Sequence, residues 1–140
     1  MRIGVTGASG MVGINVCKEV LRNGDKLNIL IREDVNYFDK LSCNKFYGDL
    51  NDKDTLEKFC DGCDVIIHSA AMISIGFDAY DKVYEVNFIG TKNVLDASIS
   101  KKVKKFIFIS TVNAYNKNPI DQTFDETRDR KSTRLNSSHL

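Results

Sequence analysis

Apolar runs that alternate with amphipathic stretches constrain the fold of this chain more than any other feature. Such runs cover residues 2–6, 27–31, 45–48, 64–68 and 104–110. Three of them, at 27–31, 64–68 and 104–110, are apolar over most of their length, as expected of strands that are covered on both faces. Strands that alternate with helices need crossover connections, which favour a parallel sheet. We therefore predict an α/β fold built on a parallel sheet.

Helical periodicity marks three stretches between these runs. The first runs to about Asn23, where Asn23-Gly24-Asp25 predicts a helix end and a turn. The second starts from a cap at Asn51 or Asp52 and runs through Phe59, and the third ends at about Ser100. The predicted buried positions of the first and third stretches are Val12, Val16, Val20 and Leu21, and Val83, Val86, Gly90, Val94 and Ala97.

The composition favours one soluble globular domain and argues against several classes of protein. The chain has 140 residues, of which 42% are hydrophobic and 28% charged, and its formal net charge is +1. A nearly neutral chain has no overall field that would recruit nucleic acid or an anionic membrane. No apolar run approaches ~20 residues, the length that spans a bilayer. The four cysteines follow no secretion signal, which indicates reduced thiols and a cytoplasmic location.

Cys60 and Cys63 form the most closely spaced cysteine pair. One pair cannot complete a four-ligand zinc site, and Cys17 and Cys43 lack metal-ligand spacing. The pair also precedes a strand instead of following one, unlike a thioredoxin-like redox turn. We therefore assign these cysteines to packing and predict no metal site. His68 ends an apolar strand, and we interpret it as a structural histidine.

A glycine-rich turn follows the first predicted strand, with the sequence Thr6-Gly7-Ala8-Ser9-Gly10-Met11-Val12-Gly13. Gly7 permits a tight turn, Gly10 lets the backbone approach a pyrophosphate, and Gly13 lets the helix pack closely on the sheet. The N–H groups of the first helical turn, around Met11 and Val12, then face an anionic ligand. We therefore predict that residues 7–13 bind a nucleotide. A tight turn without a ligand is the alternative.

Further motifs follow this turn in a fixed order. They are Gly48-Asp49-Leu50, Gly62-Cys63-Asp64-Val65-Ile66-Ile67-His68-Ser69-Ala70-Ala71, Val86-Asn87-Phe88-Ile89-Gly90-Thr91-Lys92-Asn93-Val94, the strand over 106–115 and Asp125-Glu126-Thr127. With these motifs the chain resembles the extended short-chain dehydrogenase/reductase family, or NAD-dependent epimerase/dehydratase family, over residues 1–127. It is most similar to the dihydroflavonol-4-reductase-like and 3β-hydroxysteroid-dehydrogenase-like branch, with sugar-nucleotide epimerases and dehydratases as neighbours. The resemblance implies the N-terminal five-strand portion of a Rossmann fold, a doubly wound parallel sheet with strand order 3-2-1-4-5 and helices on both faces.

The resemblance also implies a dinucleotide cofactor whose phosphorylation state depends on Arg32. This residue stands just past the second strand, where an acid would accept a hydrogen bond from the adenosine ribose of NAD. A guanidinium suits the 2′-phosphate of NADP instead, since it offers paired donors to phosphate oxygens. We therefore expect NADP, and NAD remains the alternative because Glu33 could restore that preference. A solvated surface arginine is the competing interpretation.

Two loops supply the other implied cofactor contacts. Asp49 would accept a hydrogen bond from the exocyclic amine of adenine, and Leu50 would add backbone and apolar contact. Ala70 and Ala71 would leave space for the ribose and the nicotinamide. In the competing interpretations, Asp49 simply ends a strand and the two alanines serve helix–sheet packing.

The implied active site is incomplete in this chain. Thr111, with Ser110 as second choice, would hydrogen-bond the substrate carbonyl; a satisfied strand-end hydroxyl is the alternative. Asn87 would organise the hydrogen bonds of the site, and a surface asparagine is the alternative for this residue. Gly90, inside the same helix as Asn87, suggests close packing or the approach of a ligand. The family's Tyr-x-x-x-Lys motif is absent, because no Tyr is followed four residues later by Lys. We expect that motif beyond Arg128, which makes this chain an inactive fragment.

The last residues differ from the rest of the chain. Residues 129–140 have no hydrophobic period, and 129–139 match the in-frame translation of a common sequencing-library adapter. We therefore predict an incomplete NAD(P)-binding Rossmann domain over 1–128 and a non-native, adapter-derived tail over 129–140. A native polar tail is the alternative.

Together these features predict an NAD(P)-dependent oxidoreductase that transfers a hydride to or from a carbonyl or alcohol substrate. The expected partners are a small-molecule substrate and, for the full-length protein, a second copy in a homodimer, with no nucleic acid and no membrane. An NAD-dependent sugar-nucleotide epimerase or dehydratase is one alternative. A non-catalytic dinucleotide sensor is another.

Overall fold

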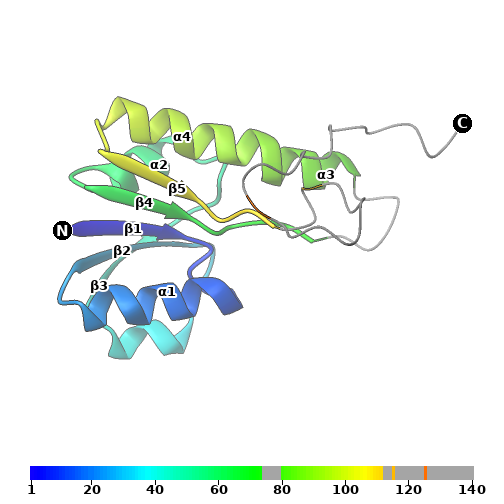
Figure 1. Cartoon of the computed structure of the whole chain (residues 1–140). Helices are drawn as coiled ribbons and strands as arrows, with labels where there is room; N and C mark the ends of the chain where they lie inside the picture. The colour runs from blue at the N-terminus through cyan, green and yellow to red at the C-terminus, as the bar shows by residue number, and fades with distance from the viewer. Residues whose placement is uncertain (74–79, 112–114, 116–124, 126–140) are drawn as a thin grey trace, which may run out of the picture. The chain divides into compact units, whose positions relative to one another are not determined.

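The strand β1 (Arg2–Thr6) lies in the middle of a five-stranded parallel sheet with the order β3-β2-β1-β4-β5 (Figure 1). The other strands are β2 (Lys26–Ile31), β3 (Cys43–Tyr47), β4 (Val65–His68) and β5 (Lys105–Phe108). In the computed structural model, residues 1–73, 80–111, 115 and 125 are described. The chain divides into two units, Met1–Ile109 and Ser110–Leu140, and the whole sheet belongs to the first.

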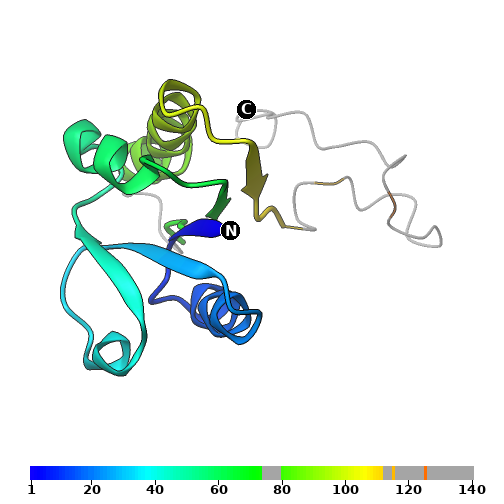
Figure 2. The same ribbon diagram turned by 90° about the vertical axis from the view of Figure 1, so that its left-hand side faces the viewer.

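Helices cover both faces of the sheet in this first unit. They are α1 (Met11–Arg22), the short 3₁₀ helix η1 (Asn36–Lys40), α2 (Lys53–Cys60), α3 (Tyr80–Tyr84), the π-helical segment η3 (Glu85–Gly90) and α4 (Thr91–Ser100). Figure 2 shows α1 and η1 on one side of the strands and α2 and α4 on the other. Two hydrophobic clusters result, because alternate residues of a strand point to opposite faces of a sheet.

The two clusters divide the central strands between them. On the α1 side, Val5 and Ile29 are fully buried against Cys17 of α1. On the α2 and α4 side, Ile66 is fully buried among residues that include Phe59 and Val94. Strands that are buried on both faces explain why their sequences are apolar without alternation.

Local sequence explains where the helices begin and end. Asp52 caps α2, since its side chain accepts a hydrogen bond from the backbone N–H of Thr55 at 3.0 Å. Gly24, with a φ of 75°, follows the end of α1 and turns the chain toward β2. The sequence pattern predicted both features.

The predicted topology is confirmed, and a few details differ. All five strands form in the predicted order, but the last ends at Phe108 instead of Ser110. Val12, predicted to be buried, is 45% exposed, and the buried positions of α1 are Gly13, Cys17 and Val20. At the first turn of α1, the buried position is therefore Gly13 and not the predicted Val12. In the described part of the chain, no helix is long and apolar enough to cross a membrane. The predicted tail over 129–140 lies outside the described residues.

The side of the sheet at β5 carries exposed apolar side chains. Ile107 is 38% exposed, Phe108 53% and Ile109 40%. Since β5 pairs with β4 and is the last strand in the order, these residues lie at an edge of the sheet. Exposed apolar residues on an edge strand promote association with other chains.

The close approach of α1 to the turn before it can be tested with a matched pair of glycine variants. A Cβ at Gly13 would overlap the carbonyl oxygen of Gly7 and lie 2.8 Å from Cα of Ala8, whereas a Cβ at Gly10 would lie 3.3 Å from its nearest neighbour. Gly13→Ala should therefore lower the free energy of unfolding by about 1–3 kcal/mol. Gly10→Ala should change it by less than about 0.5 kcal/mol. Urea denaturation followed by circular dichroism measures both. Equal effects of the two substitutions would contradict the close approach seen here.

Candidate functional site

A cleft of about 730 Å³ opens where the parallel strands end at their carboxyl edge. Its walls come from the glycine-rich turn after β1, the end of β2, the loop after β3, the segment after β4 and one side of α3 and η3. The predicted site residues that line it are Gly7, Ser9, Gly10, Arg32, Asp49, Leu50, Ala70 and Ala71. In open parallel sheets, ligands bind at this edge of the sheet.

The glycine-rich turn forms the floor of the cleft. Gly7 has a φ of 67°, and a Cβ there would lie 2.6 Å from the backbone nitrogen of Ala70. Gly10 donates from its N–H to the carbonyl of Gly7 at 3.0 Å, and as the N-cap residue of α1 it brings no side chain over the first turn. The N–H groups at the start of α1 are thus left to solvent or to an anionic ligand.

Three other residues of the predicted turn do not line the cleft. Gly13 is buried and serves the packing of α1 on the turn, as predicted. Met11 is 83% exposed and Val12 45% exposed, so their side chains lie on the surface of α1. A contribution of these two residues to binding would come from the backbone N–H groups of the first helical turn.

The loop after β3 is held in place by residues from the η3–α4 region. Asn93 donates from Nδ2 to the carbonyl of Leu50 at 2.9 Å. A Cβ at Gly90 would lie 2.8 Å from Cβ of Leu50. Of the two explanations for Gly90, close packing is therefore the one that the structure supports.

The neighbouring side chains of this loop also have partners. Oδ1 of Asp49 accepts a hydrogen bond from the N–H of Asn51 at 2.7 Å, a local turn at the end of the strand. Asn51 in turn donates from Nδ2 to Oε1 of Glu85 at 2.8 Å. This bond links the loop after β3 with η3 at the wall of the cleft.

Arg32 lies at the wall of the cleft and is exposed. The loop that follows it is tied to β3, since Lys45 donates from Nζ to Oδ1 of Asp34 at 3.1 Å. Glu33, the residue expected to compete with Arg32, is also exposed. The guanidinium is thus available to a ligand in the cleft.

His68 is fully buried at the end of β4. Its Nδ1 lies 2.7 Å from Oγ1 of Thr6, and its Nε2 lies 2.9 Å from Oγ1 of Thr91. Burial lowers the pKa of the imidazole from 6.5 to about 4, so the ring is neutral at neutral pH. The interpretation of His68 as a structural histidine is confirmed.

The side chain of Asn87 forms two hydrogen bonds to the segment after β4. Its Oδ1 accepts from the N–H of Met72 at 2.7 Å, and its Nδ2 donates to the carbonyl of the same residue at 2.9 Å. Asn87 itself does not line the cleft, but Met72 does. A free surface asparagine, the alternative interpretation, does not describe this side chain.

Ser110 and Thr111, the predicted substrate-binding hydroxyls, belong to the second unit of the chain and are exposed. They follow Ile109 directly in the sequence. Their assignment as catalytic residues stays a prediction.

Sequence reasoning missed several residues of the cleft wall. Lys82, Glu85 and Val86 reach it from α3 and η3, and Asn51 and Met72 reach it from the loops after β3 and β4. Lys82 and Val86 are four residues apart, so they share one side of a helix. That spacing was the available signal, but nothing in the sequence indicates which side of this helix faces the cleft.

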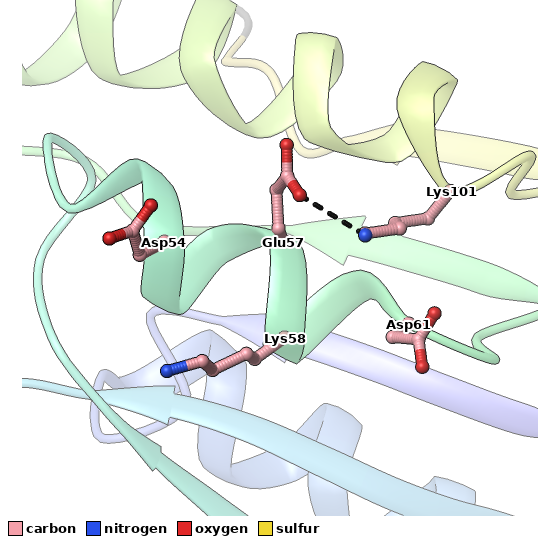
Figure 3. A pocket seen from close by; sticks show the side chains of 5 residues that line it. All are labelled: Asp54, Glu57, Lys58, Asp61 and Lys101. Carbon is pink, nitrogen blue, oxygen red and sulfur yellow. Dashed lines mark ion pairs between the residues drawn. The ribbon is translucent and has the colours of Figure 1, made fainter.

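A second hollow, of about 420 Å³, lies over α2 and the end of α4. Figure 3 shows its five charged side chains and one ion pair among them. Nζ of Lys101 lies 3.1 Å from Oε2 of Glu57. The others are Asp54, Lys58 and Asp61. All five lining residues are charged, whereas pockets that bind organic ligands are lined mainly by apolar side chains.

The cysteines play a packing role, as predicted. Cys60 and Cys63 are buried free thiols, and Cys63 accepts a hydrogen bond from Nδ2 of the buried Asn28 at 3.4 Å. Burial raises the pKa of the Cys63 thiol to about 11, which makes it unreactive. Within the described ranges of the chain, no cluster of His, Cys, Asp and Glu side chains could hold a metal ion.

The burial of His68 predicts a loss of stability in mild acid. Unfolded chains take up a proton on this histidine near pH 6.5, whereas the folded chain does so only near pH 4. Lowering the pH from 7 to 4 therefore favours the unfolded state, by about 3 kcal/mol. The lowered pKa values of Asp34, Asp52 and Asp64 act in the same direction, mainly below their unfolded value of 3.8 and only slightly at the acid end of this window, and they act equally in a His68 variant.

The measurement is the free energy of unfolding at several pH values for the wild-type chain and for His68→Gln. The variant should be less stable at pH 7 and should lose less stability between pH 6.5 and pH 4. Parallel pH profiles of the two proteins would contradict the assignment.

Comparison with known proteins supports the resemblance inferred from the motifs. The sequence pattern of the 3-beta hydroxysteroid dehydrogenase/isomerase family matches residues 4–139. "Sterol demethylase protein B" of Methylococcus capsulatus is 31% identical over 117 residues, which cover 82% of this chain and 36% of that protein. "L-arabinose 1-dehydrogenase (NAD(P)(+))" of Haloferax volcanii is 33% identical over 127 residues, which cover 90% of this chain and 47% of that protein.

A solved structure gives the same result. The UDP-glucose 4-epimerase of Thermus thermophilus in complex with NAD superposes with a TM-score of 0.79 and 27% identity, covering 94% of this chain and 44% of that one. The chain thus spans less than half the length of these relatives. It belongs to the 3-beta hydroxysteroid dehydrogenase/isomerase family, within the short-chain dehydrogenase/reductase fold.

Proposed function

We propose that this chain is the cofactor-binding part of an NAD(P)-dependent oxidoreductase that acts on a carbonyl or alcohol. The observation that carries the proposal is the cleft at the carboxyl edge of the sheet, whose floor is the turn over Gly7 and Gly10. Its volume of about 730 Å³ suits a small organic ligand. The absence of side chains at the two glycines leaves the backbone open to a pyrophosphate beside the start of α1.

Each wall of the cleft suits one part of a dinucleotide. Asp49 and Leu50 would hold the adenine, and Arg32 would pair with a 2′-phosphate on the adenosine ribose. Ala70 and Ala71, which are small, would leave room for the second ribose and the nicotinamide. We therefore propose NADP as the cofactor, with NAD as the alternative.

The chemistry requires groups on both sides of the substrate. A bound nicotinamide would supply or accept the hydride at its C4. The hydroxyl of Thr111, or of Ser110, would donate a hydrogen bond to the substrate oxygen that gains charge. Asn87 would act by holding the backbone of Met72 beside the cleft. The proton donor of the family's Tyr-x-x-x-Lys motif is not in this sequence.

A sugar-nucleotide epimerase or dehydratase is the second candidate function. It is favoured by the similarity to the Thermus thermophilus epimerase. Such an enzyme would return the hydride to its own substrate and keep the cofactor bound, whereas a reductase would release it. Whether the cofactor stays bound through gel filtration after turnover of the complete protein distinguishes them. A non-catalytic sensor would bind the cofactor and turn over no substrate.

We also propose that the complete protein is a cytoplasmic homodimer without a nucleic-acid or membrane partner. Tyr80, Tyr84 and Phe88 form a ladder of aromatic rings whose centroids are 6.4 and 5.0 Å apart, and each is between 44% and 55% exposed. Exposed apolar surface of this kind suits contact with another protein. The free thiols are compatible with a reducing compartment.

We also propose that residues 1–128 are an incomplete domain and that residues 129–140 are a non-native tail. The absence of a hydrophobic period in the tail supports this division.

The role of Arg32 can be tested on this chain with fragments of the cofactor. The wild-type chain should bind 2′-phospho-ADP-ribose about tenfold more tightly than ADP-ribose, since one charge-assisted hydrogen-bond pair is worth roughly 1.5–3 kcal/mol. Arg32→Ala should bind both equally. Arg22→Ala is the matched control, because Arg22 is exposed at the end of α1 and pairs with Glu19. Isothermal titration calorimetry measures all three proteins, and the same preference in Arg32→Ala as in wild type would exclude the assignment.

The missing proton donor predicts that this chain binds the cofactor without turning over substrate. Loss of a general acid alone typically slows a reaction ~10²–10⁴-fold. Absorbance at the nicotinamide band, followed with NADPH and a panel of ketones and aldehydes, should show no consumption above the uncatalysed rate. Robust turnover would show that the proton donor lies within these 140 residues.

A further inference from the structure

His68 lies at the centre of a chain of hydrogen bonds that joins three elements of the fold. Its two ring nitrogens contact Thr6 at the end of β1 and Thr91 at the start of α4, at 2.7 and 2.9 Å. The ring also packs beside Phe106 and Phe108 of β5, with centroids 5.9 and 5.8 Å away. Both ring nitrogens therefore have a hydroxyl partner, as buried polar groups require, and the two partners lie on different elements.

The contacts alone give the directions of the two hydrogen bonds at Thr91. Oγ1 of Thr91 lies 2.7 Å from the carbonyl oxygen of Asn87, and since a carbonyl cannot donate, the hydroxyl donates to it. With its proton used there, Thr91 accepts from His68, so Nε2 of the imidazole carries the hydrogen.

The protonation state of Nδ1 follows from the charge of the ring. Burial lowers the pKa of His68 to about 4, so the ring is neutral and Nδ1 is an acceptor. Thr6 therefore donates from Oγ1 to Nδ1, and the same oxygen accepts from the N–H of Ala70 at 3.4 Å. All donors point the same way, from Ala70 through Thr6, His68 and Thr91 to Asn87.

Both ends of this chain reach one wall of the cleft. At one end, Thr6 holds Ala70 through its hydroxyl and accepts at its carbonyl oxygen from the hydroxyl of Ser69, at 2.7 Å. At the other end, the backbone of Asn87 takes the bond from Thr91, while its side chain holds both backbone groups of Met72. Residues 69–72 all line the cleft. Asn87 lies in the π-helical segment, a form of helix that occurs often at functional sites.

We propose that His68, as the neutral Nε2–H tautomer, is a positioning residue that fixes the segment Ser69–Met72 against the nicotinamide half of the cofactor. The inference rests on the proposed function, because it assigns this wall of the cleft to that half. The adenine half is held by other residues, in the loop after β3. Cutting the chain of hydrogen bonds should therefore weaken binding of the complete dinucleotide and spare binding of its adenine part.

The test uses a matched pair at Thr91 in the full 140-residue chain. Thr91→Val keeps the shape of the side chain and removes the hydroxyl, whereas Thr91→Ser keeps the hydroxyl. The dissociation constants for NADPH and for 2′,5′-ADP are measured by calorimetry. Thr91→Val removes both hydrogen bonds of the hydroxyl, so it should bind NADPH about tenfold more weakly than wild type and bind 2′,5′-ADP equally well. Thr91→Ser should behave as wild type with both ligands.

A second measurement reads the proton on the ring directly. Nitrogen-15 NMR of the imidazole should show a protonated Nε2 and an unprotonated Nδ1 in wild type at pH 7. A protonated Nδ1 would overturn the proposal even if the valine variant does not fold. Equal NADPH affinity of Thr91→Val and Thr91→Ser would also overturn it, and so would equal losses of NADPH and 2′,5′-ADP binding, which indicate a general structural effect. Failure of the wild-type chain to bind either nucleotide would instead contradict the proposed function on which the inference rests.

Discussion

The close contact between the start of α1 and the turn before it is the constraint on which the rest of the structure depends. Gly13 has no room for a Cβ beside the carbonyl of Gly7, and Gly7 has none beside the backbone of Ala70. These two glycines therefore bring β1, α1 and the segment after β4 into backbone contact at one point. The cleft opens beside this point, with Gly7 and Gly10 in its lining and the start of α1 next to them. A side chain at either glycine would separate the elements whose closeness makes the site.

The segment over η3 and α4 holds the loops that form the other walls of the cleft. Four of its residues contact three parts of the structure: Asn87 bonds Met72, Thr91 bonds His68, and Gly90 and Asn93 both contact Leu50. Their spacing spans the change from π-helix to α-helix, so these residues do not lie on a single α-helical stripe. The sequence motif that resembles a family signature is, in physical terms, a helix that ties two loops and one strand end to a common position.

Much of this could be predicted from the sequence, and the limits have a physical cause. The parallel sheet follows from apolar runs and crossover rules, its strand order from the family resemblance, and the roles of Gly7 and Gly13 from the spacing of the turn. Val12 was misplaced because periodicity alone cannot tell that Gly13, with no side chain, occupies the position closest to the turn. The partners of His68 and Asn51 could not be foreseen, since each contact joins residues at least 23 positions apart that are brought together only by the folded sheet. Such contacts depend on packing, and packing leaves no local pattern in the sequence.

The charges around the cleft indicate where its affinity for an anion must arise. Among its lining residues, Arg32 and Lys82 are cationic and Asp49 and Glu85 are anionic, so the formal charges cancel. A pyrophosphate therefore gains little from the average field of the site, and its binding must rely on the aligned N–H groups at the start of α1 and on the bare backbone at Gly10. These groups do not move or titrate, so their contribution is the same for NAD and NADP. We propose that the exposed guanidinium of Arg32, directly after the end of β2, discriminates between the two, because the 2′ position of the adenosine ribose is expected there.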